Sequence, residues 1–105
     1  MPGQGYILAI DQGTTGSAAL LCDEEGRVVS SADREVRQIY PQPGWVEHDP
    51  KELLRTSLAV AREALQKAGV SLSQVRGVGI TNQRETTVVW ERYTGKPVCN
   101  ALVWQ

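Results

Sequence analysis

The sequence lacks an excess of charge of either sign. Its 105 residues include 11 lysine or arginine residues and 12 aspartate or glutamate residues, for a formal net charge of -1. A balanced charge provides no electrostatic attraction to nucleic acid or to an anionic membrane surface. We therefore expect neither nucleic acid nor a membrane as a partner.

Long hydrophobic runs and clustered cysteines are also lacking. The apolar run Ile7–Ile10 ends at Asp11, and no basic segment precedes it. Such a run is too short for a signal peptide or a membrane span. Cys22 and Cys99 lie far apart without a CxxC motif. These features predict a cytoplasmic protein with reduced, partly buried thiols rather than a disulfide or a metal site.

Near its start the sequence contains a short apolar strand that ends in a carboxylate. Ile7–Ile10 predicts a buried strand with Asp11 at its C-terminal tip, followed by a turn rich in glycine and threonine. Such a turn can offer N–H groups and hydroxyls to a phosphate, and a carboxylate suits Mg²⁺. We predict that Asp11 holds Mg²⁺ while Thr14 and Thr15 bind phosphate oxygens. An ordinary β-hairpin turn remains the alternative, because neither a Walker lysine nor a GxGxxG fingerprint is present.

The first third of the chain predicts an antiparallel meander of three strands. Ser17–Cys22 and Val28–Ala32 follow the first strand, and the polar run Asp23–Arg27 predicts the turn between them. The charged run Asp33–Arg37 predicts that the third strand continues as a solvated edge of the sheet.

A connector and a helix come next. Prolines and a glycine in Ile39–Pro50 predict an irregular segment, which we expect to be packed by its aromatic side chains. For His48, the single histidine, we expect a surface or capping role. Asp49 as N-cap, Glu52 as its capping-box partner and Gly69 as the stop predict a helix over residues 50–68. Its apolar stripe is expected to consist of Leu54, Leu58, Ala61, Leu65 and Ala68.

After the helix, Val75–Thr81 predicts a strand that returns parallel to the first one. Parallel strands end at one edge of a sheet, so Asn82–Glu85 should emerge beside Asp11. There Arg84 and Glu85 could bind the vicinal hydroxyls of a small polyol, although adjacent unlike charges are also common on surface turns. Two further strands are predicted, over residues 86–90 and 101–104.

Several stretches together resemble the FGGY carbohydrate kinase family. They are Asp11–Thr15, Pro43–Pro50, Gly79–Thr87 and Thr94–Pro97 with Val103–Gln105, and residues 82–87 resemble the glycerol-phosphorylating members in particular. The resemblance spans essentially the whole chain. It implies an α/β fold with a ribonuclease H-like mixed sheet of the actin and hexokinase type. By the same resemblance, residues 1–105 are an incomplete N-terminal part of the first kinase domain, and the second domain is absent.

The resemblance also implies an activity and assigns roles. The implied reaction is ATP-dependent phosphorylation of glycerol to sn-glycerol 3-phosphate by a full-length homodimer or homotetramer, with this fragment inactive alone. ATP phosphates would meet Thr14, Thr15 and Gly16, and Mg²⁺ would meet Asp11. Glycerol would meet Arg84, Glu85 and Trp104. The catalytic base is expected beyond Gln105.

Two positions depart from the pattern of the family. Many members have a serine where this chain has Gly16 and an arginine where it has Ala18, which leaves the affinity for phosphate open. Two other functions also stay open: another FGGY sugar kinase, and an ATP-binding module of the actin or Hsp70 kind.

Overall fold

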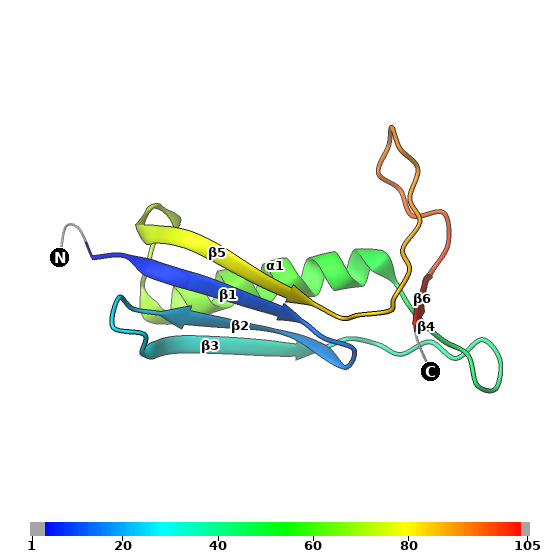
Figure 1. The fold of residues 1–105 in the computed structure, drawn as a ribbon, viewed down its shortest axis with the longest axis horizontal. Coiled ribbons are helices and arrows are strands. Elements are labelled where there is room, and N and C mark those ends of the chain that lie inside the picture. Colours follow the sequence, from blue (N-terminus) through cyan, green and yellow to red (C-terminus); the bar gives the residue numbers. More distant parts are fainter. Residues whose placement is uncertain (1–3, 104–105) are drawn as a thin grey trace.

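A four-stranded mixed sheet covered by one helix forms the body of the molecule. The structure, a computed structural model, describes residues 4–103. The sheet has the order β3-β2-β1-β5, and a two-stranded sheet of β4 and β6 lies at one end (Figure 1). The elements are β1 Tyr6–Gln12, β2 Gly16–Cys22, β3 Val28–Glu35, β4 Val46–His48, α1 Pro50–Ala68, the 3-10 helix η1 Leu72–Gln74, β5 Val75–Asn82 and β6 Ala101–Val103.

The predicted meander and the parallel return are both confirmed. β1 pairs antiparallel with β2, β2 pairs antiparallel with β3, and β1 pairs parallel with β5. β3 is the edge strand, as its charges predicted, but it ends at Glu35 instead of continuing to Arg37. A parallel strand needs a crossover connection, and α1 supplies it.

Helix α1 begins and ends where the sequence predicts. Asp49 Oδ1 accepts a hydrogen bond from the Lys51 N–H at 3.0 Å, and Gly69 adopts the left-handed conformation, with φ 65°, that ends the helix. The predicted capping box does not form, because Glu52 Oε2 accepts instead from the Arg37 N–H at 3.1 Å. The Glu52 side chain therefore fastens the connector to the helix.

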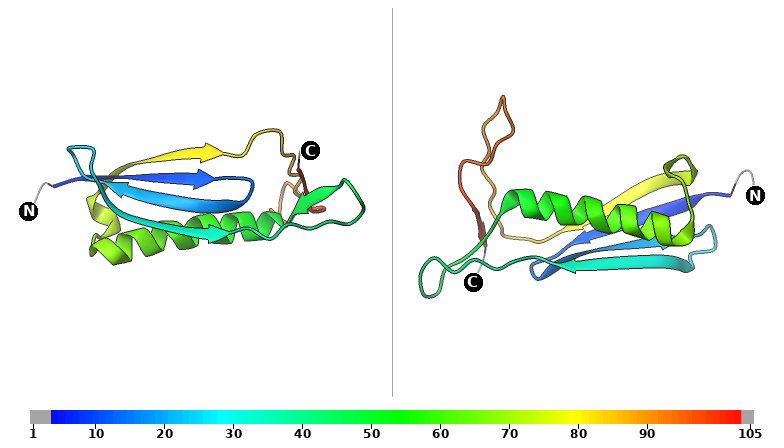
Figure 2. Two further views of the ribbon diagram at one scale, coloured as in Figure 1. Left: turned by 90° about the horizontal axis from the view of Figure 1, so that it is seen from below. Right: turned by 180° about the vertical axis from the view of Figure 1, so that it is seen from behind.

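The apolar stripe expected for α1 is wrong in its first half. Leu54 and Leu58 are exposed, and the buried side chains are Leu53, Val60, Ala61 and Ala64. α1 covers only one face of the sheet and lies mainly over β2 and β3 (Figure 2). Apolar residues occupy a wide arc of this helix, so periodicity alone does not decide which of them face the sheet. The core also contains Leu8, Ala19, Leu21 and Ala32.

Two segments differ from the strands and loops expected. The connector contains the short strand β4, which pairs with β6, and its Tyr40 and Trp45 are exposed rather than packed. Residues 86–90 do not form a strand; they contribute only isolated bridges of Thr87 to Leu102 and of Trp90 to Pro97. A strand is maintained by its partners, and among residues 4–103 this segment has no continuous neighbouring strand.

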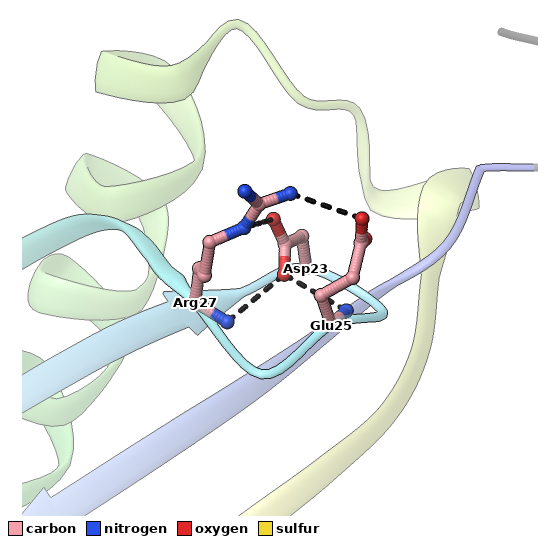
Figure 3. Close-up of polar contacts among 3 residues, drawn as sticks. All are labelled: Asp23, Glu25 and Arg27. Atoms are coloured by element: carbon pink, nitrogen blue, oxygen red, sulfur yellow. Dashed lines mark hydrogen bonds and ion pairs between the residues drawn. The ribbon is translucent and has the colours of Figure 1, made fainter.

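The turn between β2 and β3 is built on Asp23 (Figure 3). Its Oδ1 accepts hydrogen bonds from the Arg27 N–H at 2.9 Å and from the Glu25 N–H at 3.0 Å, and its Oδ2 lies 3.2 Å from Arg27 Nε. The backbone hydrogen bond from Arg27 is the largest of the contributions that lower the pKa of Asp23 below its ordinary 3.8. This predicted turn is confirmed, at the end of the sheet away from β4 and β6.

The two cysteines differ in exposure. Cys22 is half-buried as expected, whereas the expectation of a partly buried thiol is wrong for Cys99, which is exposed; both are free thiols. Within residues 4–103, no helix has the length and the apolar character needed to cross a membrane.

The core predicts the cost of two leucine substitutions. Leu21 is fully buried, so Leu21→Ala leaves a cavity and should lower the free energy of unfolding by about 2 to 5 kcal/mol. Leu58 is 51% exposed on the helix, so Leu58→Ala should change the free energy of unfolding by less than about 0.5 kcal/mol. Urea unfolding monitored by circular dichroism compares them. Equal losses would contradict this assignment of the buried helix face.

The Asp23 turn predicts a loss of stability in acid. Because the folded-state pKa of Asp23 is lowered, its ionised carboxylate stabilises the fold above about pH 4, and this contribution disappears as the pH falls through the folded-state value. Asp23→Asn should therefore lower the midpoint of thermal unfolding at pH 7, and the difference from the parent should shrink below pH 3.8. A difference that is independent of pH would contradict this role.

Candidate functional site

The ends of β1 and β5 form one edge of the sheet. Asp11 is paired in register with Thr81, and Gln12 with Asn82, in the parallel ladder. The β1–β2 turn and the segment 83–85 therefore leave the sheet at the same end, next to the start of α1 (Figure 1). This is the common edge that the sequence predicts, and ligands of α/β sheets gather at such edges.

The β1–β2 turn, residues 13–16, joins two antiparallel strands and is closed by a hydrogen bond from the Gly13 N–H to the Gly16 carbonyl at 2.8 Å. The carbonyls of Thr14 and Thr15 also have partners, namely Gln38 Nε2 at 3.0 Å and the Val36 N–H at 2.9 Å. The hydroxyls of both threonines make no hydrogen bond to any residue in 4–103. The turn is thus a hairpin whose acceptors are occupied and whose hydroxyls are free for a ligand.

Gly16 is required here by a close approach of the backbone. A Cβ atom at this position would lie 2.5 Å from the Arg34 carbonyl oxygen, because β3 pairs beside it. A backbone oxygen cannot move away as a flexible side chain can, so a serine at position 16 would require a shift of β3. Glycine in place of the serine of many family members therefore fits the close packing of β2 against β3 in this chain.

Asp11 projects from the strand tip on the sheet face opposite α1. Leu8 and Ile10 face the core, and side chains alternate along a strand, so Asp11 points the other way. It is exposed, and its carboxylate makes no hydrogen bond or ion pair with residues 4–103. In the same range no three His, Cys, Asp or Glu side chains group to hold a metal. A free single carboxylate fits Mg²⁺, which is commonly bound by one or two carboxylates together with water and substrate phosphates.

Open grooves flank the turn on both sides. One, of about 460 Å³, runs beside β2 and β3, and the other, of about 500 Å³, runs along β1 and β5 at Asp11. The second groove is lined by Ala9, Ile10, Asp11, Ala18, Leu20, Gly79, Ile80 and Thr81.

Arg84 and Glu85 are both exposed and do not pair with each other. No ion pair within residues 4–103 includes either side chain. Glu85 has φ 59°, the left-handed region that non-glycine residues seldom adopt, and is the sole non-glycine residue with positive φ in the described range. Backbone strain of this kind clusters at functional sites, so it is an observation independent of the sequence motif.

A polar bridge, which the sequence reading missed, joins the two loops. It consists of the buried side chains of His48 and Gln83 and the half-buried side chains of Gln12 and Gln38. His48 is fully buried, so the expected surface or capping role is wrong. Burial lowers its pKa below 6.5, and the Glu52 carboxylate opposes that shift only in part. His48 directly precedes the helix N-cap, a position where a buried side chain often packs, and this could have signalled its burial.

One predicted site residue cannot be placed. Trp104 lies outside the described residues. The remaining six, Asp11, Thr14, Thr15, Gly16, Arg84 and Glu85, all lie on the two loops or at the strand tip of the shared edge.

Comparison with known proteins identifies the family of the chain. The N-terminal domain model of the FGGY family of carbohydrate kinases matches residues 6–105. The chain belongs to this family. It is 62% identical over 100 residues to a glycerol kinase of a Polaromonas species and 61% identical to one of Delftia acidovorans. Each match covers 95% of this chain but only 20% of the relative, so the chain spans about one fifth of the length of these relatives.

A solved structure confirms the fold class of this FGGY chain. The structure of Plasmodium falciparum glycerol kinase with ADP has a TM-score of 0.83 at 38% identity, covering 96% of this chain and 20% of that one. The ribonuclease H-like mixed sheet expected from the sequence is therefore present, in incomplete form.

The strained backbone at Glu85 predicts different effects of two substitutions on stability. Glu85→Gly allows positive φ without strain and should raise the free energy of unfolding by about 1 kcal/mol, whereas Glu85→Ala keeps the strain and should not. Urea unfolding of the two variants measures this. Equal stabilities would indicate that the left-handed backbone at position 85 is not strained.

Proposed function

We propose that this chain is the N-terminal part of the first domain of an ATP-dependent and Mg²⁺-dependent glycerol kinase. The observation that carries the proposal is the parallel register of β1 and β5. This register brings the β1–β2 turn, with its free threonine hydroxyls, and the exposed side chains of Arg84 and Glu85 to one edge of the sheet. The 62% identity to a glycerol kinase supports glycerol rather than a larger sugar as the substrate.

At the nucleotide side, the hydroxyls of Thr14 and Thr15 and the backbone of Gly16 bind the ATP phosphates. The occupied carbonyls of Thr14 and Thr15 point into the protein, which removes acceptors that would repel a phosphate. Asp11 holds the metal, directly or through water, and Mg²⁺ when bound supplies neutralisation of the phosphate charge.

At the acceptor side, Glu85 and Arg84 bind the glycerol hydroxyls. A carboxylate accepts two hydroxyl hydrogen bonds, and a guanidinium donates to hydroxyl oxygens in a fixed geometry. Because the two side chains do not pair with each other among the described residues, both are available to the polyol. Trp104 is proposed as an apolar wall beside the glycerol carbons.

The proposed reaction transfers the γ-phosphoryl group to a terminal glycerol hydroxyl. The hydroxyl oxygen forms a bond to the γ-phosphorus, the bond to the bridging oxygen of ADP breaks, and the hydroxyl proton passes to a carboxylate base beyond Gln105. The described residues contribute by binding and orienting the two substrates. We further propose a homodimeric or homotetrameric full-length protein that is located in the cytoplasm.

Turnover by the full-length protein tests this function. With MgATP, glycerol should give ADP and sn-glycerol 3-phosphate, whereas xylulose and gluconate should give at least about 100-fold lower kcat/KM, because their additional groups do not match the site. Preference for either sugar would make the protein a different sugar kinase. ATP hydrolysis without a phosphorylated product would favour an ATP-binding module of the actin or Hsp70 kind. Residues 1–105 alone should show no glycerol-dependent release of ADP.

The role of Glu85 predicts a selective defect. In the full-length protein, Glu85→Ala should lower kcat/KM for glycerol by at least about 100-fold, because a buried hydroxyl of the bound substrate loses its partner, and should leave the affinity for ATP within about twofold. Steady-state kinetics and nucleotide titration measure the two quantities. Loss of both to the same extent would remove Glu85 from the acceptor site.

A further inference from the structure

His48 lies between the two loops of the proposed site. It ends β4, and its ring is completely buried. Its Nε2 atom is 3.0 Å from Gln38 Oε1, and its Nδ1 atom is 3.3 Å from Gln83 Nε2. A single imidazole therefore contacts two glutamines that come from different parts of the chain.

The first glutamine links His48 to the β1–β2 turn. Gln38 places its Nε2 atom 3.0 Å from the Thr14 carbonyl and 3.0 Å from the Val36 carbonyl. Carbonyls only accept, so this atom must be the NH₂ group of the amide. Gln38 Oε1 then faces His48 as an acceptor, and the imidazole must carry its proton on Nε2.

The second glutamine links His48 to the acceptor segment. Gln12 Nε2 donates to the Gly13 carbonyl at 3.0 Å, which leaves Gln12 Oε1 to accept from Gln83 Nε2 at 3.0 Å. The other hydrogen of Gln83 Nε2 points to His48 Nδ1, and Gln83 Oε1 accepts from the Thr86 hydroxyl at 3.1 Å. Gln83 immediately precedes Arg84 and Glu85.

The bridge is consistent only with a neutral imidazole. Protonation of Nδ1 would place an N–H against the NH₂ group of Gln83, so two donors would face each other without an acceptor. Desolvation by burial lowers the pKa of His48 and thus favours the neutral form.

We infer that His48 is a positioning residue that couples the ATP-binding turn 13–16 to the glycerol-binding segment 83–85. The inference rests on the proposed function. A substrate that fixes one loop also fixes the imidazole, through Gln38 or Gln83, and thereby lowers the cost of ordering the other loop. Binding of ATP and binding of glycerol thus both order the same imidazole, although His48 itself contacts neither substrate.

Calorimetric titration of the full-length protein tests the coupling. Glycerol should bind about tenfold more tightly when a non-hydrolysable ATP analogue and Mg²⁺ are present than when they are absent. In His48→Phe this ratio should fall to about one, because the ring has neither donor nor acceptor. Gln42→Ala, a substitution of an exposed glutamine in the same connector, should keep the ratio of the parent.

Two conservative substitutions separate the two halves of the bridge. In His48→Gln the amide NH₂ can reach the position of Nε2 and donate to Gln38, but no acceptor occupies the position of Nδ1, so the KM for glycerol should rise about tenfold with little change in the KM for ATP. In His48→Asn the shorter amide can place its oxygen at the position of Nδ1 and accept from Gln83, but no donor reaches Gln38, so the KM for ATP should rise instead. A purely structural role would change both KM values together in both variants.

Each outcome decides the inference. An unchanged ratio in His48→Phe overturns it, and so does a ratio of one in the parent protein. If His48→Phe does not fold, Gln38→Glu replaces it: the isosteric carboxylate cannot donate to the Thr14 carbonyl, so the ratio should again fall to about one, and an unchanged ratio overturns the inference. A parent protein that does not phosphorylate glycerol overturns both proposals, whereas normal turnover with unchanged coupling in the variants overturns only this one.

Discussion

The parallel pairing of β1 with β5 is the constraint on which the rest of the structure depends. Antiparallel pairing of the same two strands would place Asp11 and the segment 83–85 at opposite ends of the sheet. The parallel register is possible because α1 carries the chain back along the length of the sheet, and it aligns Asp11 with Thr81. The described residues of the candidate site lie at one edge of the sheet because of this alignment.

The second constraint is the burial of polar groups behind the shared edge. Side chains of Gln12, Gln38, His48 and Gln83 satisfy one another and the backbone carbonyls of Gly13 and Thr14. In a low-dielectric interior such a network is favourable only when each donor finds an acceptor, which fixes the orientation of every amide. The β1–β2 turn and the segment 83–85 are therefore held in place by these side-chain hydrogen bonds as well as by their own backbone conformation.

Much of this could be read from the sequence, and the exceptions have physical reasons. Local signals were sufficient for the meander, for the N-cap Asp49 and for the helix end at Gly69, because turn and cap chemistry acts over a few residues. They were insufficient for Leu54 and Leu58, whose exposure depends on where α1 crosses the sheet. The same applies to β4 and β6, because Val46 and Val103 become partners only through the complete fold. His48 was misread since its partners are remote in sequence.

The pleat of β1 separates two tasks that neighbouring residues perform. Asp11 projects to one side of the sheet and Gln12 to the other, so the negative charge stays away from the uncharged imidazole and its amide neighbours. A slip of β1 by a single position would exchange them, directing the acid inward and the amide toward solvent. Insertions or deletions before residue 11 are thus tolerated only outside the strand. The alternation of side chains keeps the charged Asp11 and the uncharged hydrogen-bond network on opposite faces of the sheet.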